Sequence, residues 1–506
     1  MGNADPGIGG GDRHYCHCLI SAFAVFLTLT LLLSILTLKG ACFSISPSLD
    51  RAMVMVHRYI MKILFLEIET EKTWALASVG PAFIASYIRG HGHSASLLRV
   101  KPDQELHDII DDIEKESPHI LGFSLTTRQW LRAVNVAREI RNNMDIPIIA
   151  GGSHPTFAAP SVLESGAFDY VCIGEGEKAV CDILSCMEKG EDISTARIPN
   201  ICVKGSGPPE LRPPVSVDSL PFMARDLLDE IEGVIHISAM RGCPFSCTSC
   251  AGGAIGRLYE PREYVRRRSV NNVLKELRYI RENGPMNYVI FLDDTFTMHK
   301  GWLVEFCTVY GREIGAGFSI NARADTVSPD IITMLAQAGC KHIVYGVESG
   351  SKRVREEILN RPGENRQFID VFRWTKEAGI MATANYMIGI PGETHEDIAQ
   401  TLALNDELAP DDFGYFVFYP YPGTPLFNVC RERGYLPDNY LDLPANNRQS
   451  ILTLPDLTKD KIHHYYNVFT DLREKNYLRR YGGSLNDAQK AAAIKSLRES
   501  ADPECS

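Results

Sequence analysis

Three cysteines within eight residues constrain this chain more than any other feature of its sequence. Cys243, Cys247 and Cys250 lie in one loop, with a glycine and a proline beside the first of them. Thiolates at this spacing supply soft, anionic ligands to three different irons of one iron–sulfur cube and leave the fourth iron without a protein ligand. We therefore predict a metal-cluster loop at this point of the chain.

Two other uses of these cysteines are weaker. A structural zinc site usually adds a fourth Cys or His at a matching interval, and no CxxC or HxxxH pair follows downstream. Buried structural thiols rarely show this spacing. Most of the other cysteines are scattered singly through apolar segments, such as Cys172, Cys307 and Cys340, which indicates free thiols in a reducing compartment.

Length and charge narrow the class of protein. The chain has 506 residues, of which 45% are hydrophobic and 23% charged, so we expect two or three domains with sizeable cores. A net charge of −11 argues against a nucleic-acid partner, because phosphate binding needs a concentrated positive surface. We interpret the run Arg266–Arg268 as a solvated approach to a helix that Ser269 caps.

The first part of the chain, residues 1–60, is a hydrophobic extension. Leu19–Leu38 carries no charge and is long enough to cross a bilayer. It is either a membrane anchor or lies ahead of a true translation start near Met61. A cleaved signal is the weakest alternative, because export would place the cluster in an oxidising space. We expect a cytoplasmic protein, and an anchor would hold its catalytic domains at the cytoplasmic side of the membrane.

Residues 61–205 alternate between short apolar runs and helical patterns, which predicts a parallel sheet covered by helices on both faces. Ligands of such sheets bind at the carboxyl ends of the strands. We predict strands at 61–67, 94–100, 119–125, 147–150 and 170–173, and helices at 78–89, 103–114, 129–142 and 177–188.

A proline-rich stretch, 206–229, predicts an extended linker before the next domain. In 230–430 a strand followed by a helix repeats, which predicts six parallel strands in an open, partial (β/α)6 barrel. The region 431–506 predicts a helical C-terminal cap and tail. The barrel strands are expected at 234–240, 288–292, 318–322, 342–347, 381–388 and 415–419, with helices beginning near Ser269, Trp302, Ser328, Arg366 and His395.

The CxxxCxxC spacing after an apolar strand resembles the radical S-adenosylmethionine (SAM) enzymes. In that family the open iron chelates the amino and carboxylate groups of SAM, and one electron from the cluster breaks a carbon–sulfur bond to give methionine and a 5′-deoxyadenosyl radical. The resemblance implies that Cys243, Cys247 and Cys250 are the catalytic ligands of a 4Fe–4S cluster and that flavodoxin or ferredoxin donates the electron. This chain departs from the family at Ser249, where an aromatic residue is usual.

Polar residues follow the predicted barrel strands, and the resemblance implies contacts with SAM for several of them. Asp293 and Asp294 stand where the family contacts the SAM amino group, and the Arg323 guanidinium matches the geometry of the SAM carboxylate. Glu348 is expected near the ribose hydroxyls or the amino group, and Gly389 near the adenine. Any one of these polar groups is equally compatible with a strand end that faces solvent.

Three loops of the N-terminal domain resemble the cobalamin-binding domain that precedes the radical SAM barrel in one large subgroup. They contain the sequences LTT, GGSHPT and GEGE, and the resemblance implies cobalamin contacts for Thr126, Gly151, Gly152, Glu175 and Gly176. The two glycines would let the backbone approach a large ligand. The segment 67–74 contains no axial histidine, which implies either cobalamin bound without a protein imidazole or a domain that has lost cobalamin.

The sequence therefore predicts an α/β protein: an N-terminal doubly wound, Rossmann-like cobalamin-binding domain, a partial radical SAM barrel and a small helical C-terminal region. Our first hypothesis is a radical SAM enzyme that uses SAM and cobalamin to methylate an unactivated carbon of a small molecule. The alternatives are a radical cyclase or rearrangement enzyme of the same architecture, and a non-catalytic cobalamin or SAM sensor tethered to a membrane through residues 19–38.

Overall fold

The structure, a computed structural model, describes residues 60–70 and 78–501. The membrane span that we predict at 19–38 and the alternative translation start near Met61 both depend on residues 1–59, which lie outside this part. Within the described residues, no helix is both long enough and apolar enough to cross a membrane.

The N-terminal sheet has six strands in the order β2-β1-β3-β4-β5-β6. All five predicted strands are confirmed and are parallel, whereas the short β6 pairs antiparallel with β5 at the edge. The order reverses direction between β1 and β3, which is the point where doubly wound sheets bind ligands. The strands are β1 (Lys62–Ile68), β2 (Ser94–Val100), β3 (Ile120–Ser124), β4 (Ile148–Gly151), β5 (Tyr170–Cys172) and β6 (Ile201–Val203).

Helices cover both faces of this sheet, so its strands are apolar on both sides. In β1, Ile63 and Phe65 pack in the core that includes α3 and α7. The alternate residues Leu64 and Leu66 pack in the core on the other face, which includes α4, α5 and α6. The helices are α3 (Val79–Gly90), α4 (Leu106–Glu116), α5 (Trp130–Asn143), α6 (Ser153–Glu164) and α7 (Glu177–Glu188).

The second large sheet is the predicted open barrel. Its six strands are all parallel, in the order β14-β13-β12-β11-β10-β7, and the two outermost strands do not pair with each other. The strands are β7 (Val234–Ile237), β10 (Tyr288–Phe291), β11 (Gly317–Ala322), β12 (Cys340–Glu348), β13 (Met381–Ile388) and β14 (Asp412–Val417). A small hairpin of β8 (Met240–Arg241) and β9 (Arg266–Arg267) follows β7.

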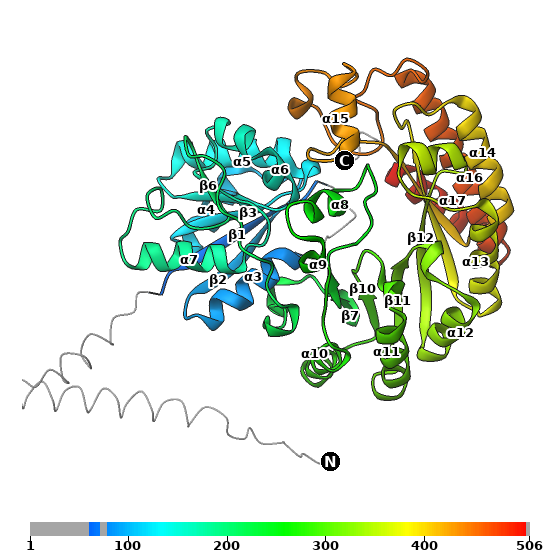
Figure 1. Cartoon of the computed structure of the whole chain (residues 1–506), viewed down its shortest axis with the longest axis horizontal. Coiled ribbons are helices and arrows are strands. Elements are labelled where there is room, and N and C mark those ends of the chain that lie inside the picture. The colour runs from blue at the N-terminus through cyan, green and yellow to red at the C-terminus, as the bar shows by residue number, and fades with distance from the viewer. Residues whose placement is uncertain (1–59, 71–77, 502–506) are drawn as a thin grey trace, which may run out of the picture. The chain divides into compact units, whose positions relative to one another are not determined.

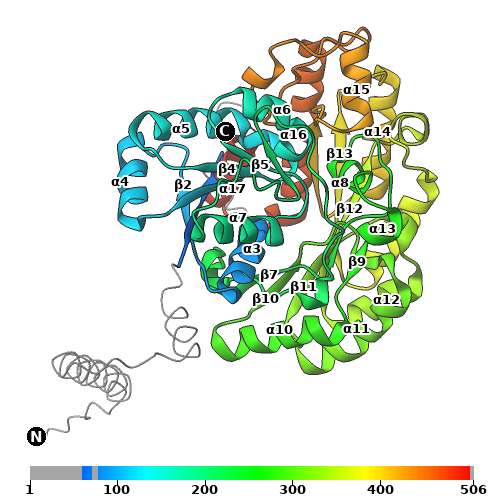
Figure 2. The ribbon, with the colours of Figure 1, turned by 60° about the vertical axis from the view of Figure 1, so that its left-hand side comes forward.

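Five helices lie around the outer side of these strands (Figures 1 and 2). Ser269 caps the first of them as predicted, because its side chain accepts a hydrogen bond from the Asn272 amide at 3.2 Å. Gly339 ends α12 with φ of 101°, which a glycine adopts without strain. The helices are α10 (Val270–Asn283), α11 (Lys300–Glu313), α12 (Pro329–Ala338), α13 (Asn365–Glu377) and α14 (His395–Leu408).

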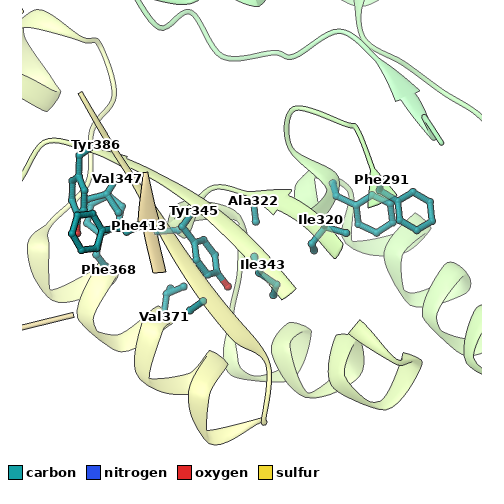
Figure 3. Close-up of a cluster of buried hydrophobic side chains, with 14 of the residues drawn as sticks. Phe291, Ile320, Ala322, Ile343, Tyr345, Val347, Phe368, Val371, Tyr386 and Phe413 are labelled. Atoms are coloured by element: carbon teal, nitrogen blue, oxygen red, sulfur yellow. The ribbon is translucent and has the colours of Figure 1, made fainter. Parts of the chain in front are cut away.

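Along each barrel strand, successive side chains face the surrounding helices and the barrel interior in turn. In β13, Ala384 and Tyr386 are buried in the main core, whereas Asn385 lines two interior cavities. Figure 3 shows this core, in which Tyr345 from β12 lies near Val371 from α13. The alternate residues of the strands are therefore free to line a site.

The C-terminal region is helical, as predicted, with α15 (Pro425–Glu432), α16 (Lys459–Tyr481) and α17 (Asp487–Ala501). Helix α16 packs on β14, where the rings of Phe469 and Tyr415 stack at 5.7 Å. Arg473 of α16 also donates two hydrogen bonds to the Asp412 carboxylate, at 2.9 and 2.8 Å. These contacts cover the last strand of the barrel.

Candidate functional site

The cluster loop runs from β8 to the short helix α8 (Ala251–Gly256) and is fixed at both ends. At its start, Gly242 has φ of 86°, and a Cβ atom there would lie 2.5 Å from the Tyr264 carbonyl oxygen, so only glycine fits. Further along, the Thr248 amide donates to the Leu359 carbonyl at 3.1 Å, and the Thr248 hydroxyl donates to the Ile358 carbonyl at 2.6 Å. The loop is therefore held between the hairpin and the barrel.

The three cysteines of this loop line one cavity of about 580 Å³. Cys247 is buried, Cys243 is half-buried and Cys250 is exposed, and none of them forms a disulfide. Within the described residues, no three metal-ligating side chains converge closely enough to hold a single ion. A cube places each thiolate on a different iron, so its ligands need not converge on one point. The cavity lining contains no fourth cysteine and no histidine, so the donor set fits a three-cysteine cluster.

Three of the predicted SAM residues line the same cavity: Asp294, Arg323 and Glu348. Burial raises the pKa of the Asp294 carboxyl above its usual range. Glu348 ends β12 with φ of 67° at an irregularity in the pairing with β13, and this strained backbone turns its side chain out of the strand pattern. Its carboxylate lies 3.8 Å from the Arg361 guanidinium.

Arg323 has a defined environment beside the cluster loop. Its guanidinium lies over the Phe245 ring, 3.7 Å from the centroid, and forms an ion pair with Asp325 at 2.7 Å. Its Nη1 atom donates toward the Cys247 sulfur at 3.5 Å. Arg361 approaches the same sulfur at 3.8 Å, so two positive charges lie next to one cysteine.

The structure does not bring Asp293 and Gly389 into the cavity lining. The Asp293 carboxylate accepts hydrogen bonds from the Ala239 amide at 3.0 Å and the Met240 amide at 2.6 Å, which secures the chain ahead of the cluster loop. Burial raises its pKa to about 7, although these backbone donors lower it. Gly389 faces Ile462 of α16, and its amide donates to Glu393 at 2.7 Å.

Residues of the N-terminal domain also line this cavity. These are Thr126, Thr127 and Arg128, which follow β3, and Ser153, which begins α6. Thr126 forms a capping box with Gln129 that fixes the turn after the strand. One cavity therefore has walls from the cluster loop, the barrel strands and the β3 and β4 loops.

The two loops meet at Gly151 and Gly152. The Leu125 amide donates to the Gly151 carbonyl at 2.7 Å, and the His154 amide donates to the Leu125 carbonyl at 3.1 Å. Gly152 has φ of 100°, and a Cβ atom there would lie 2.6 Å from the Leu125 carbonyl oxygen. Gly152 thus permits a close approach of backbone to backbone, whereas a Cβ atom at Gly151 would make an ordinary contact of 3.6 Å with Cys172. Neither glycine lines the cavity.

His154 is a core residue. It is 1% exposed, its ring lies 4.8 Å from the Trp130 ring, and its Nδ1 atom is 3.2 Å from the Thr127 hydroxyl. Burial lowers its pKa to about 4, so the ring is neutral near neutral pH. With no histidine in the cavity lining, the site fits cobalamin held without a protein imidazole.

The GEGE loop joins the two domains through ion pairs. Glu175 accepts hydrogen bonds from Arg266 at 3.1 and 2.5 Å, and Glu177 pairs with Arg241 at 2.5 Å. Burial raises the pKa of Glu175, but the two arginines outweigh this and lower the pKa below its usual range. We call Glu175, Glu177, Arg241 and Arg266 the interdomain clamp. Gly176 packs against Ile84 of α3, and neither Glu175 nor Gly176 lines the cavity.

The interpretation of Arg266–Arg268 as a solvated run is wrong for two of its three residues. Arg266 belongs to the interdomain clamp, and Arg268 is 4% exposed and pairs with the fully buried Glu276 at 2.5 Å. Arg267 alone is exposed. Because β9 pairs with β8, alternate side chains of this run face the protein interior. Counting charges in the sequence does not indicate this pairing.

Several residues that line the cavity carry little or no signal in the sequence. Phe245 and Arg361 had no motif to mark them, and Arg128 comes directly after the recognised LTT loop. Tyr421, by contrast, lies in the turn 419–425, which was expected either to border the substrate or to pack the barrel; it lines the cavity, and its hydroxyl donates to Asn447 at 3.0 Å. Phe245 lies two residues after Cys243, and this position inside the cluster loop was the available sign that its ring borders the cavity.

Two protein-family models match the chain. The radical SAM superfamily matches residues 237–404, and the B12 binding domain matches residues 76–184. The chain is 28% identical over 391 residues to an uncharacterized methyltransferase of Pyrococcus horikoshii, covering 73% of this chain and 83% of that protein. It is 24% identical to the anaerobic magnesium-protoporphyrin IX monomethyl ester cyclase of Rubrivivax gelatinosus, covering 74% of this chain and 70% of the relative.

Solved structures share the fold. The cobalamin-dependent SAM radical enzyme OxsB, with aqua-cobalamin bound, matches with a TM-score of 0.68 and 15% identity, over 93% of this chain and 78% of its own. The radical SAM methyltransferase TsrM from Kitasatospora setae matches with a TM-score of 0.62 and 16% identity, over 74% of this chain and 76% of its own. The chain therefore contains a B12-binding domain followed by a radical SAM domain, and the cofactors of these two domains are a 4Fe–4S cluster, SAM and cobalamin.

Proposed function

We propose that this protein is a cobalamin-dependent methyltransferase that methylates an unactivated carbon of a small organic molecule. One observation carries the proposal: the three cysteines, the polar strand ends of the barrel and the β3 and β4 loops of the B12-binding domain line a single cavity. A substrate in that cavity would contact groups from both domains at once. The methyltransferase named among the relatives supports the same class of reaction.

When bound, the cluster and SAM supply an oxidising radical and a methyl group, and cobalamin supplies a carrier for that methyl group. Cys243, Cys247 and Cys250 would hold the cluster. Asp294 and Glu348 offer carboxylates to the SAM amino group and ribose, and Arg323 adds positive charge for the SAM carboxylate. Asp293 would act one step away, by holding the chain that leads into the cluster loop.

On the other wall, Thr126 and Ser153 would contact cobalamin directly, because both line the cavity. Gly151 and Gly152 would act through the backbone that they shape. Glu175 and Gly176 would set the distance between the two domains rather than touch the ligand, since Glu175 is engaged by two arginines. An electron donor such as flavodoxin or ferredoxin would reduce the cluster, and a membrane contact would depend on residues 19–38.

A second candidate is a radical cyclase of the same architecture, which the similarity to the cyclase of Rubrivivax gelatinosus favours. The two reactions differ in the fate of SAM. A methyltransferase consumes one SAM for its methyl group and one for radical chemistry, so it releases S-adenosylhomocysteine together with 5′-deoxyadenosine. A cyclase has no need to release S-adenosylhomocysteine.

The test uses the full chain, reconstituted anaerobically with iron, sulfide and cobalamin, and SAM that carries a deuterated methyl group. We expect both S-adenosylhomocysteine and 5′-deoxyadenosine by mass spectrometry, and loss of the former when cobalamin is omitted. Release of 5′-deoxyadenosine alone would contradict methyl transfer and favour the cyclase. Binding of SAM and cobalamin that survives replacement of all three cysteines by alanine, with neither product in the parent protein, would indicate a sensor.

A further inference from the structure

One segment of the barrel contacts three consecutive residues of the cluster loop. The segment is 358–361, which lies between β12 and α13, and we call it the brace. The Asn360 side chain donates to the Ser246 carbonyl at 3.2 Å and to the Ser246 hydroxyl at 2.9 Å. Thr248 donates to two carbonyls of the brace, at 2.6 and 3.1 Å. The brace therefore holds Cys247 from both sides.

Buried hydrogen bonds fix the brace to the barrel. The brace continues from a turn of π-helix, Val354–Ile358, an irregularity that is frequent at functional sites. The Arg361 amide donates to the Arg355 carbonyl at 2.7 Å. Arg355 is fully buried, and its guanidinium donates to the Ser349 carbonyl at 2.6 Å and to the Gly363 carbonyl at 2.7 Å. A side chain on the brace is thus held at a fixed position relative to the cluster loop.

Arg361 of the brace extends toward the cysteine that lies between these contacts. Its Nη1 atom donates toward the Cys247 sulfur at 3.8 Å, and its Nη2 atom donates to the Gly346 carbonyl at 2.6 Å. A Cβ atom at Gly346 would lie 2.7 Å from that Nη2 atom, so the guanidinium takes the space that a side chain would need. The guanidinium is therefore held with one N–H toward the sulfur.

Arg323 also donates toward this sulfur, at 3.5 Å, but its charge is compensated. Two of its nitrogens donate to the Asp325 carboxylate, at 2.9 and 2.7 Å. Among the residues that the structure describes, no carboxylate accepts a hydrogen bond from Arg361, and the Glu348 carboxylate lies 3.8 Å from it. Of the two guanidiniums beside Cys247, Arg361 therefore carries the less compensated charge.

A positive charge beside a cluster cysteine has a defined electrostatic effect. A cluster that takes up one electron becomes more negative, so a nearby cation and a hydrogen bond to the sulfur both stabilise the reduced form. Because Cys247 is buried, the ions of the solvent screen this interaction only weakly. The reduction potential of the cluster therefore rises with the charge at this position.

We propose that Arg361 is a positioning residue that raises the reduction potential of the cluster through its contact with Cys247. The step that it favours is the uptake of one electron, which an external one-electron donor supplies and which adds one negative charge to the cluster. No bond is made or broken in that step. Because the effect concerns the cluster alone, it is the same for a methyltransferase and for a cyclase.

The test is a redox titration of the full chain, with the cluster reconstituted anaerobically and without SAM or cobalamin. The reduced cluster is measured by electron paramagnetic resonance. We expect Arg361→Gln to lower the equilibrium constant for reduction by roughly tenfold, which is about 59 mV for one electron. Arg361→Lys keeps a positive charge and should recover most of that shift. Arg373→Gln, on the exposed side of α13, removes the same charge elsewhere and should leave the potential unchanged.

Two further variants separate the charge from the geometry of the loop. Asn360 has φ of 49°, which glycine adopts without strain, so Asn360→Gly removes the contacts with Ser246 and keeps Arg361. It should speed the loss of iron to a chelator and leave the potential unchanged. Glu348→Gln removes the carboxylate beside Arg361 and should raise the potential, opposite to the change in Arg361→Gln.

Three results would overturn the proposal. The first is the potential of the parent protein in Arg361→Gln with a full cluster. The second is an equal fall in potential in Arg361→Lys or in Asn360→Gly, which would assign the effect to the position of the loop. The third is an unchanged or lower potential in Glu348→Gln, and this result is decisive even if Arg361→Gln retains no cluster.

Discussion

The two large sheets present their functional motifs in different ways. At the carboxyl end of the barrel strands, motif residues such as Asp294, Arg323 and Glu348 place their side chains in the shared cavity. In the B12-binding domain, Gly152 works through a backbone contact and Glu175 through the interdomain clamp. Most motif residues of the barrel therefore line the cavity, with Asp293 and Gly389 as exceptions. In the other sheet Thr126 and Ser153 line it, whereas the glycines and Glu175 set the geometry around it.

The difference follows from how the two sheets are covered. The barrel strands have helices on one side only, so alternate residues such as Asn385 face the interior. The N-terminal sheet has helices on both sides, and only the loops at its edge reach a ligand. Glycines gather in those loops because the loops must pack closely against one another.

Removing a cluster ligand should abolish the function of the barrel and leave cobalamin binding by the other domain intact. We expect Cys250→Ala to abolish the absorption of the iron–sulfur cluster and all cleavage of SAM, because a cube with two protein ligands is not retained. Cobalamin affinity should stay unchanged, as measured by equilibrium dialysis. Cys181→Ala, at a buried thiol of α7, is the control and should keep both cofactors. Loss of cobalamin along with the cluster would contradict the separation of roles.

Removing one ion pair of the interdomain clamp should destabilise the barrel and the B12-binding domain together. Glu177 is 3% exposed, so Glu177→Gln removes a buried counter-charge from Arg241 and should destabilise the protein by about 3 kcal/mol, seen as a lower denaturant midpoint. Glu164→Gln, at an exposed carboxylate of α6, should change the midpoint little. If the two variants behave alike, the clamp does not hold the domains together.

A methyl group at Gly152 tests whether the B12-binding motif works through its backbone. Gly152→Ala would place Cβ against Leu125 and strain the positive φ, which should cost roughly 2–3 kcal/mol and weaken cobalamin binding. Gly90→Ala in α3 meets open space and serves as the control. Full stability in Gly152→Ala would show that the two loops do not depend on this close approach.

The buried His154 should make stability depend on pH. Its pKa is about 4 in the folded protein and about 6.5 when unfolded, so the unfolded chain binds more protons between these values. The stability that the neutral His154 contributes is therefore fully present above pH 6.5. It falls as the pH drops, by about 2 kcal/mol near pH 5. His154→Phe should remove this slope in urea titrations, whereas His107→Phe on the exposed face of α4 should keep it. An unchanged slope in His154→Phe would assign the pH dependence elsewhere.

Hydrophobic periodicity predicted most of the fold, since ten of the twelve strands in the two large sheets are longer than three residues and most of them are followed by a helix of clear pattern. It missed α6, because Gly152 and two prolines at its start and middle are typical of a loop. The short antiparallel β6 has three residues, too few to show a periodic pattern. In the site, cysteine spacing marked its residues directly, whereas Arg128 and Arg361 reach the cavity only through long-range packing.

The claim that both domains serve one cavity is tested most directly by pulsed electron paramagnetic resonance on the full chain, with a reduced cluster and cobalamin in its Co(II) form. We predict a dipolar interaction between the two unpaired spins, which Cys250→Ala abolishes and Glu177→Gln weakens. A spectrum that is the plain sum of the two separate signals would contradict it.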